Sequence, residues 1–239
     1  MGAVGGPKVP TNNLSLVLDA TNPLSYPGSG TVWTDLTQFI PFGAYGTQTP
    51  FTTIQGVPCM DFNDSGYWAM NNSGDASKVN MVTDFTLVML YYYEGIGERD
   101  TIFEKNGTVY ASYQQEVACT IEAGSPGSMT WYRGYSDYDY ADTRTFAMNT
   151  WNFNAIKGVG STTRTGYYWN PSILGWSQSY TNRTTNPITP ASIVVVGNGY
   201  AGPVETGAMA AVYVWSRALS DEEIRDVYNQ FKTKYPSLT

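Results

Sequence analysis

Histidine is absent from this chain of 239 residues. Without an imidazole there is no Ser/His/Asp triad, no histidine-bound zinc, and no side chain whose ordinary pKa lies between about 5 and 8. Any catalysis would therefore have to rest on carboxylates.

Positive charge and long apolar runs are also scarce. The chain has 13 Lys and Arg against 20 Asp and Glu, a formal net charge of -7, so we expect no nucleic acid partner. The longest apolar stretch, residues 85–93, is about half of the roughly 18 residues that span a bilayer, so we expect no membrane insertion. The opening MGAVGGPKVPTNN has no apolar core segment, which predicts cytoplasmic synthesis without a signal peptide.

Cysteine occurs only twice, at Cys59 and Cys119. Both residues lie in apolar, strand-like stretches, VPCMDF and EVACTIE. In a protein made in the cytosol this favours two buried thiols, with a disulfide between them as the alternative.

Aromatic residues and turn formers are abundant instead. Aromatics make up 15% of the chain, beside 24 Gly and 13 Pro, a composition typical of strands joined by turns. Period-2 alternation or aromatic and β-branched enrichment predicts strands at 14–19, 85–93, 101–105, 109–114, 117–122, 128–133, 151–157, 164–169, 192–197 and 208–215. Asn106-Gly107 marks a hairpin turn between two of them. The count predicts one β-sandwich domain over residues 14–239, preceded by a flexible arm over residues 1–13.

In one predicted strand, the sequence indicates which face packs against the protein interior. In WNFNAIK, Trp151, Phe153 and Ala155 share one face, while Asn152 and Asn154 share the other. This pattern predicts a strand that is packed on one side and wetted or ligand-facing on the other.

One helix is expected over residues 220–232. Ser220 can cap it, and Glu223 is the capping-box partner. Apolar side chains recur at helical spacing and must dock on the sheet; they are Ile224, Val227, Tyr228 and Phe231. Asp221 and Glu222 lie in the first turn, where the macrodipole favours a structural role for them over a catalytic one.

Several of these segments resemble the laminin-G-like jelly roll of the concanavalin A-like lectin and glucanase superfamily. LSLVLDATNPLSYPGSGTVWTDL, residues 14–36, is similar to the first strand and loop of members found in bacteriophages and other viruses. CMDFNDSGYW, residues 59–68, resembles the family's Phe-Asp-Gly segment, with Asn63 and Asp64 in place of the usual Asp-Gly step. MAAVYVWSRALSDEEIRDVYNQFKTKYP, residues 209–236, is similar to the family's closing strand, turn and capped helix. The resemblance implies an all-β fold, a two-sheet antiparallel jelly-roll sandwich with one short C-terminal helix.

The richest candidate site is WYRGYSDYDYADTR, residues 131–144. Sugars stack their C–H faces on exposed aromatics while charged groups bind their hydroxyls, and protein partners use the same residue types. The predicted ligand-binding residues of this stretch are Trp131, Tyr132, Arg133, Tyr135 and Tyr138. Tyr168 and Trp169 come from a second aromatic group, although strand alternation would place them on opposite faces. Packing of these rings in the core is the alternative.

Three acidic residues of the same stretch form a candidate metal site. Asp137, Asp139 and Asp142 could direct their carboxylates at Ca²⁺, a hard cation that prefers oxygen ligands. A solvated acidic loop is the alternative, and no other cofactor is predicted.

A fold of this kind hosts many functions, so the function must be argued from the site. The resemblance implies that a glycoside hydrolase would alternate Glu and Asp closely along one strand, and no such run is present; Glu94 and Glu98 are split by glycines. We therefore predict a non-enzymatic virion structural or surface-decoration protein, minor capsid or fibre-associated, at the virion surface. Its expected partners are other virion proteins or copies of itself, with host glycans as further candidates. A free carbohydrate-binding lectin module is the first alternative, and a glucanase-like hydrolase is the second.

Overall fold

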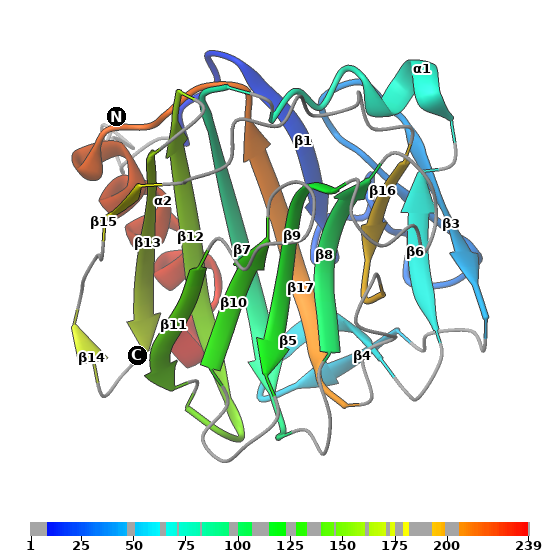
Figure 1. Ribbon diagram of the computed structural model, residues 1–239. Helices are drawn as coiled ribbons and strands as arrows, with labels where there is room; N and C mark the ends of the chain where they lie inside the picture. Colours follow the sequence, from blue (N-terminus) through cyan, green and yellow to red (C-terminus); the bar gives the residue numbers. More distant parts are fainter. Residues whose placement is uncertain are drawn as a thin grey trace, which may run out of the picture.

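Two antiparallel β-sheets pack face to face, and helix α2 (Asp221–Lys234) covers the outer side of one of them (Figure 1). This two-sheet, all-β architecture confirms the predicted fold class. The computed structural model describes residues 9–46, 51–62, 66–70, 72–81, 83–95, 100–106, 115–122, 128–132, 140–145, 147–160, 163–170, 173–174, 179–181, 193–198 and 206–238.

Sheet A, which carries the helix, has nine strands within these ranges. Their order is β14-β13-β12-β7-β17-β5-β4, with β1 also paired to β17 and β15 to β13. The strands are β1 (Leu14–Asp19), β4 (Phe51–Ile54), β5 (Val57–Asp61), β7 (Phe85–Tyr93), β12 (Thr150–Val159), β13 (Thr163–Asn170), β14 (Ile173–Leu174), β15 (Ser179–Thr181) and β17 (Ala208–Trp215). The central strands β7 and β17 are buried along their whole length. Their sequences, FTLVMLYYY and AMAAVYVW, are apolar at nearly every position because both faces meet another layer.

Sheet B has eight strands in the same ranges, in the order β11-β10-β9-β8-β16-β6-β3-β2. They are β2 (Val32–Thr34), β3 (Pro41–Tyr45), β6 (Tyr67–Met70), β8 (Asp100–Asn106), β9 (Gln115–Glu122), β10 (Ser128–Tyr132), β11 (Tyr140–Thr145) and β16 (Ile193–Val196). The remaining elements are the short helix α1 (Ser73–Ala76) and the 3-10 turn η1 (Pro236–Leu238). Because the strand order of sheet B ends at β2, this short strand forms one edge of the sheet.

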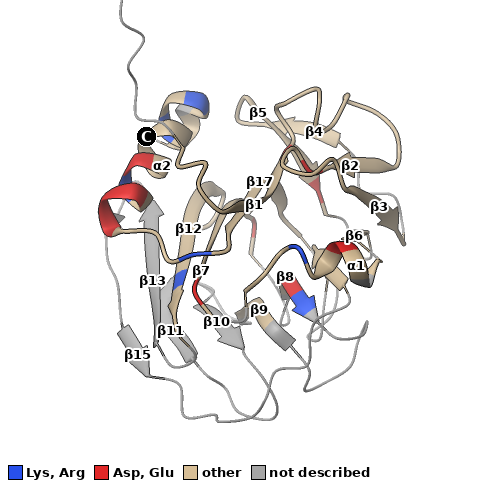
Figure 2. Ribbon diagram, turned by 90° about the horizontal axis from the view of Figure 1, so that it is seen from above, with Lys and Arg blue, Asp and Glu red and all other residues tan. Residues whose placement is uncertain are grey.

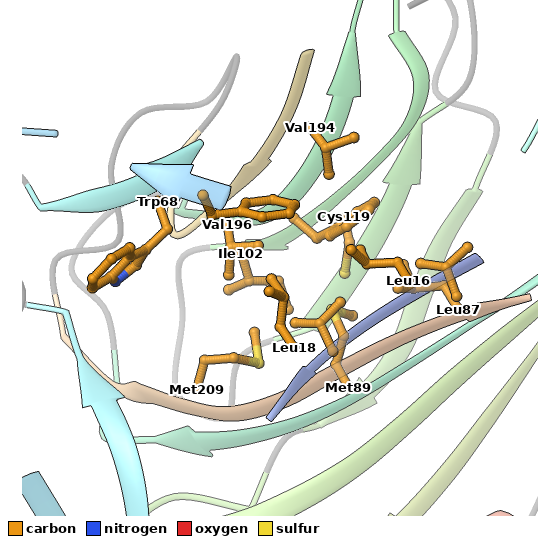
Figure 3. Packing of buried hydrophobic residues seen from close by; sticks show 14 of the residues in the cluster. Leu16, Leu18, Trp68, Leu87, Met89, Ile102, Cys119, Val194, Val196 and Met209 are labelled. Carbon is orange, nitrogen blue, oxygen red and sulfur yellow. The ribbon is translucent and has the colours of Figure 1, made fainter. Parts of the chain in front are cut away.

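Large apolar side chains fill the space between the two sheets (Figure 3). Leu16, Leu18 and Met89 approach from sheet A, and Ile102 and Val196 approach from sheet B. All five are fully buried. Burial of one such side chain contributes roughly 1.5–3 kcal/mol, so this inner core is the main source of stability.

A second apolar layer lies between sheet A and helix α2. Ile224, Val227, Tyr228 and Phe231 are the buried residues of the helix, which confirms the predicted docking face. The rings of Tyr228 and Phe231 meet Phe153 of β12 edge-on, with centroids 5.3 and 5.7 Å apart.

The two faces of β12 divide as predicted, but neither face is wetted. Trp151, Phe153 and Ala155 belong to the layer under the helix. Asn152 and Asn154 lie on the inner face and are only 3% and 1% exposed. The expectation of a wetted asparagine face is therefore wrong, because this face of the strand is turned into the sandwich.

Most of the predicted strands appear near their expected positions, and 14–19, 85–93 and 208–215 coincide with β1, β7 and β17. The predicted strand at 109–114 and Gly107 of the predicted hairpin lie outside the described residues. The strands β2, β3, β4, β6, β11, β14 and β15 were not predicted, and the stretch that forms β5 was described only as strand-like. Gln55 and Gly56 join β4 to β5 with positive φ angles of 51° and 80°, which suits a tight hairpin turn.

Both cysteines are free and buried, as the sequence predicted. Cys59 lies on the outer face of sheet A and Cys119 in the inner core.

The described part of the N-terminal segment lies against the end of β17. Trp215 Nε1 donates a hydrogen bond to the Pro10 carbonyl over 2.6 Å, and Arg217 Nε donates to the Asn12 carbonyl over 3.0 Å. The division of the chain into a flexible arm, residues 1–13, and a single domain, residues 14–239, stays a prediction. Neither helix in the described ranges has the length and apolar character needed to cross a membrane.

Candidate functional site

Two predicted ligand-binding residues, Trp131 and Tyr132, lie on β10. In the antiparallel register Trp131 pairs with Cys119 of β9, and Tyr132 pairs with Ala118. Paired residues share a face of the sheet and neighbours alternate. Since Cys119 belongs to the inner core, position 131 falls on the inner face of sheet B and position 132 on its outer face.

The other two described positions, Tyr168 and Trp169, lie on β13 opposite Asn154 and Phe153. Position 168 therefore falls on the inner face of sheet A and position 169 on its outer face. The four positions occupy four different sheet faces, so the backbone register does not bring them together on one surface. Their roles in ligand binding stay predictions.

The remaining predicted site residues are not placed. Arg133, Tyr135 and Tyr138 lie outside the described residues, as do Asp137 and Asp139 of the candidate calcium site. Asp142 lies on β11. In the part of the chain that the structure describes, no three Cys, Asp or Glu residues are grouped as a metal site, and the calcium prediction stays untested.

The outer face of sheet B carries one continuous row of paired positions. In order across the sheet, the row consists of Tyr132, Ala118, Glu104, Val195, Ala69, Gly43 and Val32. The middle of this row is covered, since Glu104 is only 2% exposed. Val32 on the edge strand β2 is 43% exposed, so the row becomes accessible at this edge.

Two stacked tyrosines lie beside that accessible edge. Tyr45 of β3 and Tyr67 of β6 are register partners, and their rings are 5.3 Å apart and inclined by only 15°. Tyr45 is 37% exposed, and Tyr67 is half-buried. The Tyr45 ring leans over Gly43, where an added Cβ would lie 3.4 Å from it. We call Tyr45 and Tyr67 the tyrosine pair.

The near-parallel geometry distinguishes this pair from the other aromatic contacts that the structure describes, which are inclined by 41° to 88°. Edge-on packing suits a core, where the edge of one ring meets the face of another. The tyrosine pair instead stacks face to face on the outer side of sheet B. Sequence reasoning missed it because both strands are short.

A pair of carboxyl groups lies on the opposite side of the molecule. Asp61 is the register partner of Ala208, and Ala208 is in turn the partner of Tyr92. Glu94 lies two residues after Tyr92, directly after the end of β7. Burial raises the pKa of Asp61, and burial together with the Asp61 charge raises the pKa of Glu94. Carboxyls of this kind can hold a proton at a higher pH than usual. They lie on the outer face of sheet A, however, so both sheets separate them from the tyrosine pair.

No protein-family model and no curated protein matches the chain. Solved structures do match its fold. Trypanosoma rangeli sialidase aligns with 100% of this chain and 36% of its own, at a TM-score of 0.65 and 13% sequence identity. The binding domain of botulinum neurotoxin DC in complex with SialylT aligns with 91% of this chain and 51% of its own, at a TM-score of 0.62 and 11% identity.

A third match is botulinum neurotoxin type C, which depends on interaction with two ganglioside molecules to enter cells. It aligns with 91% of this chain and 51% of its own, at a TM-score of 0.65 and 10% identity. The present chain thus spans about a third of the sialidase and about half of the toxin chains. At these identities the likeness shows the fold alone, and the chain has a jelly-roll β-sandwich.

Proposed function

We propose that this chain is a glycan-binding module with a concanavalin A-like fold. The tyrosine pair is the observation that carries the proposal. The C–H face of a sugar ring packs against a flat, accessible aromatic ring, and the phenol supplies a polar end. Tyr45, with 37% of its surface exposed, offers such a ring near the accessible edge of sheet B.

The structural neighbours support this class of ligand. Solved structures with a similar fold include a sialidase with 2,3-difluorosialic acid, a toxin that depends on gangliosides and a toxin domain with SialylT. Another neighbour is a toxin binding domain in complex with the protein synaptotagmin II. A protein ligand is therefore the alternative outcome of a binding screen.

We further propose that the module is not an enzyme. The chain has no histidine, and the Asp61–Glu94 pair lies on the opposite sheet face from the tyrosine pair. A sugar bound at the tyrosine pair would thus lie beyond the reach of these two carboxyls.

A location at a virion surface, with other virion proteins or copies of itself as partners, remains the finer proposal. It rests on the virus-like segments at residues 14–36 and 209–236, and none of the structural neighbours adds support for it. Copurification of the chain with particles would test it.

A glycan-array screen of the purified protein tests the proposed function. We expect selective binding, and Tyr45→Ala should weaken it about tenfold or more, as for a central aromatic contact. Phe39→Ala is the matched control, because Phe39 is 71% exposed in a loop away from the tyrosine pair. An array without any bound glycan would contradict the proposal.

Repeating the screen with calcium and with a chelator tests the predicted ion site. Binding that needs calcium would support Asp137, Asp139 and Asp142 as its ligands. Binding that is unchanged by the chelator would remove calcium from the recognition of the glycan.

A further inference from the structure

Residues 9–13, which we call the strap, lie across the end of β17 and the start of the turn that follows it. Three backbone carbonyls of the strap each accept a hydrogen bond from one of residues 215–217. The pairs are Pro10 with Trp215 Nε1 over 2.6 Å, Asn13 with the Ser216 N–H over 2.8 Å, and Asn12 with Arg217 Nε over 3.0 Å. The strap is therefore fixed at three points along its length.

A tight turn joins the strap directly to the sheet. The Leu14 N–H donates to the Thr11 carbonyl over 3.2 Å, and Asn13 has a positive φ of 57°, a conformation that asparagine adopts more readily than most residues. Leu14 then begins β1 opposite Trp215. The end of the strap is thus held at the same level of the sheet as the residues that it covers.

The strap covers the apolar layer between sheet A and α2. Trp215 belongs to this layer and is fully buried, although it is the last residue of β17. A buried indole N–H normally has an acceptor, and the Pro10 carbonyl is that acceptor. Val9 packs against the same layer. Removal of the strap would therefore take away both the acceptor of the Trp215 indole and part of its cover.

Arg217 connects the strap to the start of the helix. Its Nε donates to the strap, while Nη1 and Nη2 donate to the two carboxylate oxygens of Glu223 over 2.9 and 2.5 Å. Glu223 is the capping-box residue in the acidic first turn of α2, which is drawn in red in Figure 2. A paired contact of this kind fixes the plane of a guanidinium group. One side chain thus positions both the strap and the helix start.

From these contacts we infer that the strap is a conformational device that opens before the rest of the fold. When it is docked, it completes the apolar layer under α2 and steadies the helix start through Arg217. When it is released, it uncovers Trp215 while the sheets stay intact, a local opening of the kind that chain ends undergo. The inference is independent of the proposed glycan binding, because it uses neither residue of the tyrosine pair.

Hydrogen exchange of the indole N–H groups in the full chain tests this opening. Trp215→Phe identifies the Trp215 signal among the seven tryptophans. Trp151 is the matched control, because it is fully buried in the same layer but donates to the Ile54 carbonyl. We expect Trp215 to exchange at least about tenfold faster than Trp151, with little dependence on low urea concentrations. Equal rates with equal urea dependence would overturn the inference.

Deletion variants test the role of the strap in stability. Deletion of residues 1–12 should lower the melting temperature by about 4 °C or more, whereas deletion of residues 1–8, which keeps every contact named above, should lower it by less than about 1 °C. Glu223→Gln should lower it less in the chain without the strap, because the two contacts of Arg217 are coupled. Equal losses from both deletions, or an equal effect of Glu223→Gln with and without the strap, would overturn the inference.

Discussion

Asp19 shows how a single buried charge can hold distant elements together. It is 1% exposed at the end of β1, and it accepts hydrogen bonds from Tyr213 of β17 over 3.0 Å and from Tyr235 after α2 over 3.1 Å. Lys234 of the helix forms an ion pair with it. Burial alone would raise the pKa of Asp19, but Lys234 and the donated hydrogen bonds hold this pKa below its ordinary value of 3.8.

The lowered pKa sets the direction of the pH dependence. A carboxyl group whose pKa is lower in the folded state stabilises the fold above its unfolded-state pKa. That contribution disappears as the pH falls through the folded-state value, so acid should loosen the contact between α2 and β1.

We expect Asp19→Asn to lower the free energy of unfolding at pH 7 by about 3 kcal/mol, because Lys234 and two tyrosines lose a charged partner. Urea unfolding from neutral pH down to about pH 2 measures this effect. The difference from the unmodified protein should shrink in acid. Asp226→Asn, at a half-buried position of α2, is the control. A pH-independent difference would mean that the Asp19 charge does not stabilise the fold.

Helix α2 is the element whose local sequence most directly specifies its structure. Ser220 Oγ accepts from the Glu223 backbone N–H over 3.1 Å, and the Glu223 carboxylate accepts from the Ser220 N–H over 2.8 Å. Arg217 donates to the same carboxylate, which lowers the pKa of Glu223 to about 2. The capping box predicted from spacing is thus present, and Arg217 adds a partner that spacing alone did not indicate.

Ser220→Ala should lower the free energy of unfolding by about 1 kcal/mol, because two orphan backbone donors at the helix start lose their partners or their geometry. Thermal unfolding measures the change. Thr233→Ala is the control: the Thr233 hydroxyl donates a hydrogen bond to the backbone carbonyl of Asn229 within the helix, so we expect a change below about 0.5 kcal/mol. Equal losses in both variants would argue against a special role for the cap.

At the scale of the whole molecule, the three layers enclose two separate apolar cores. Cys59 lies in the core under the helix and Cys119 in the core between the sheets. Burial, with a smaller contribution from Asp61 and Glu94, raises the pKa of Cys59 to about 12, and burial raises the pKa of Cys119 well above its ordinary value. Each thiol therefore reports on the opening of one core.

We expect neither thiol to react with a thiol reagent at pH 8 in the native protein, since the thiolate is the reactive form and both groups are buried. Both should react in denaturant. The variants Cys59→Ala and Cys119→Ala separate the two signals. Fast native labelling of the thiol left in Cys59→Ala would mean that the core between the sheets opens without global unfolding, contrary to the packing described.

Much of the fold could be predicted because its signals are local. The long strands β7 and β17 are continuous apolar runs, and the capping box of α2 lies within four consecutive residues. The short strands β2, β3 and β6 could not be predicted in the same way. Each has five residues or fewer, too few for a periodic pattern, and they form only because sheet partners supply their hydrogen bonds.

The sequence by itself determined the all-β class, the buried thiols and the docking face of α2, because these follow from side-chain spacing and composition. Only the tertiary structure decided that the asparagine face of β12 is buried, since burial depends on which layer a strand face meets. It likewise decided that Tyr45 and Tyr67 stack, because strand pairing joins residues that are far apart in the chain. The placement of charge belongs to both: the sequence omits cations from residues 9–77, and strand pairing places β2, β3 and β6 of that segment side by side.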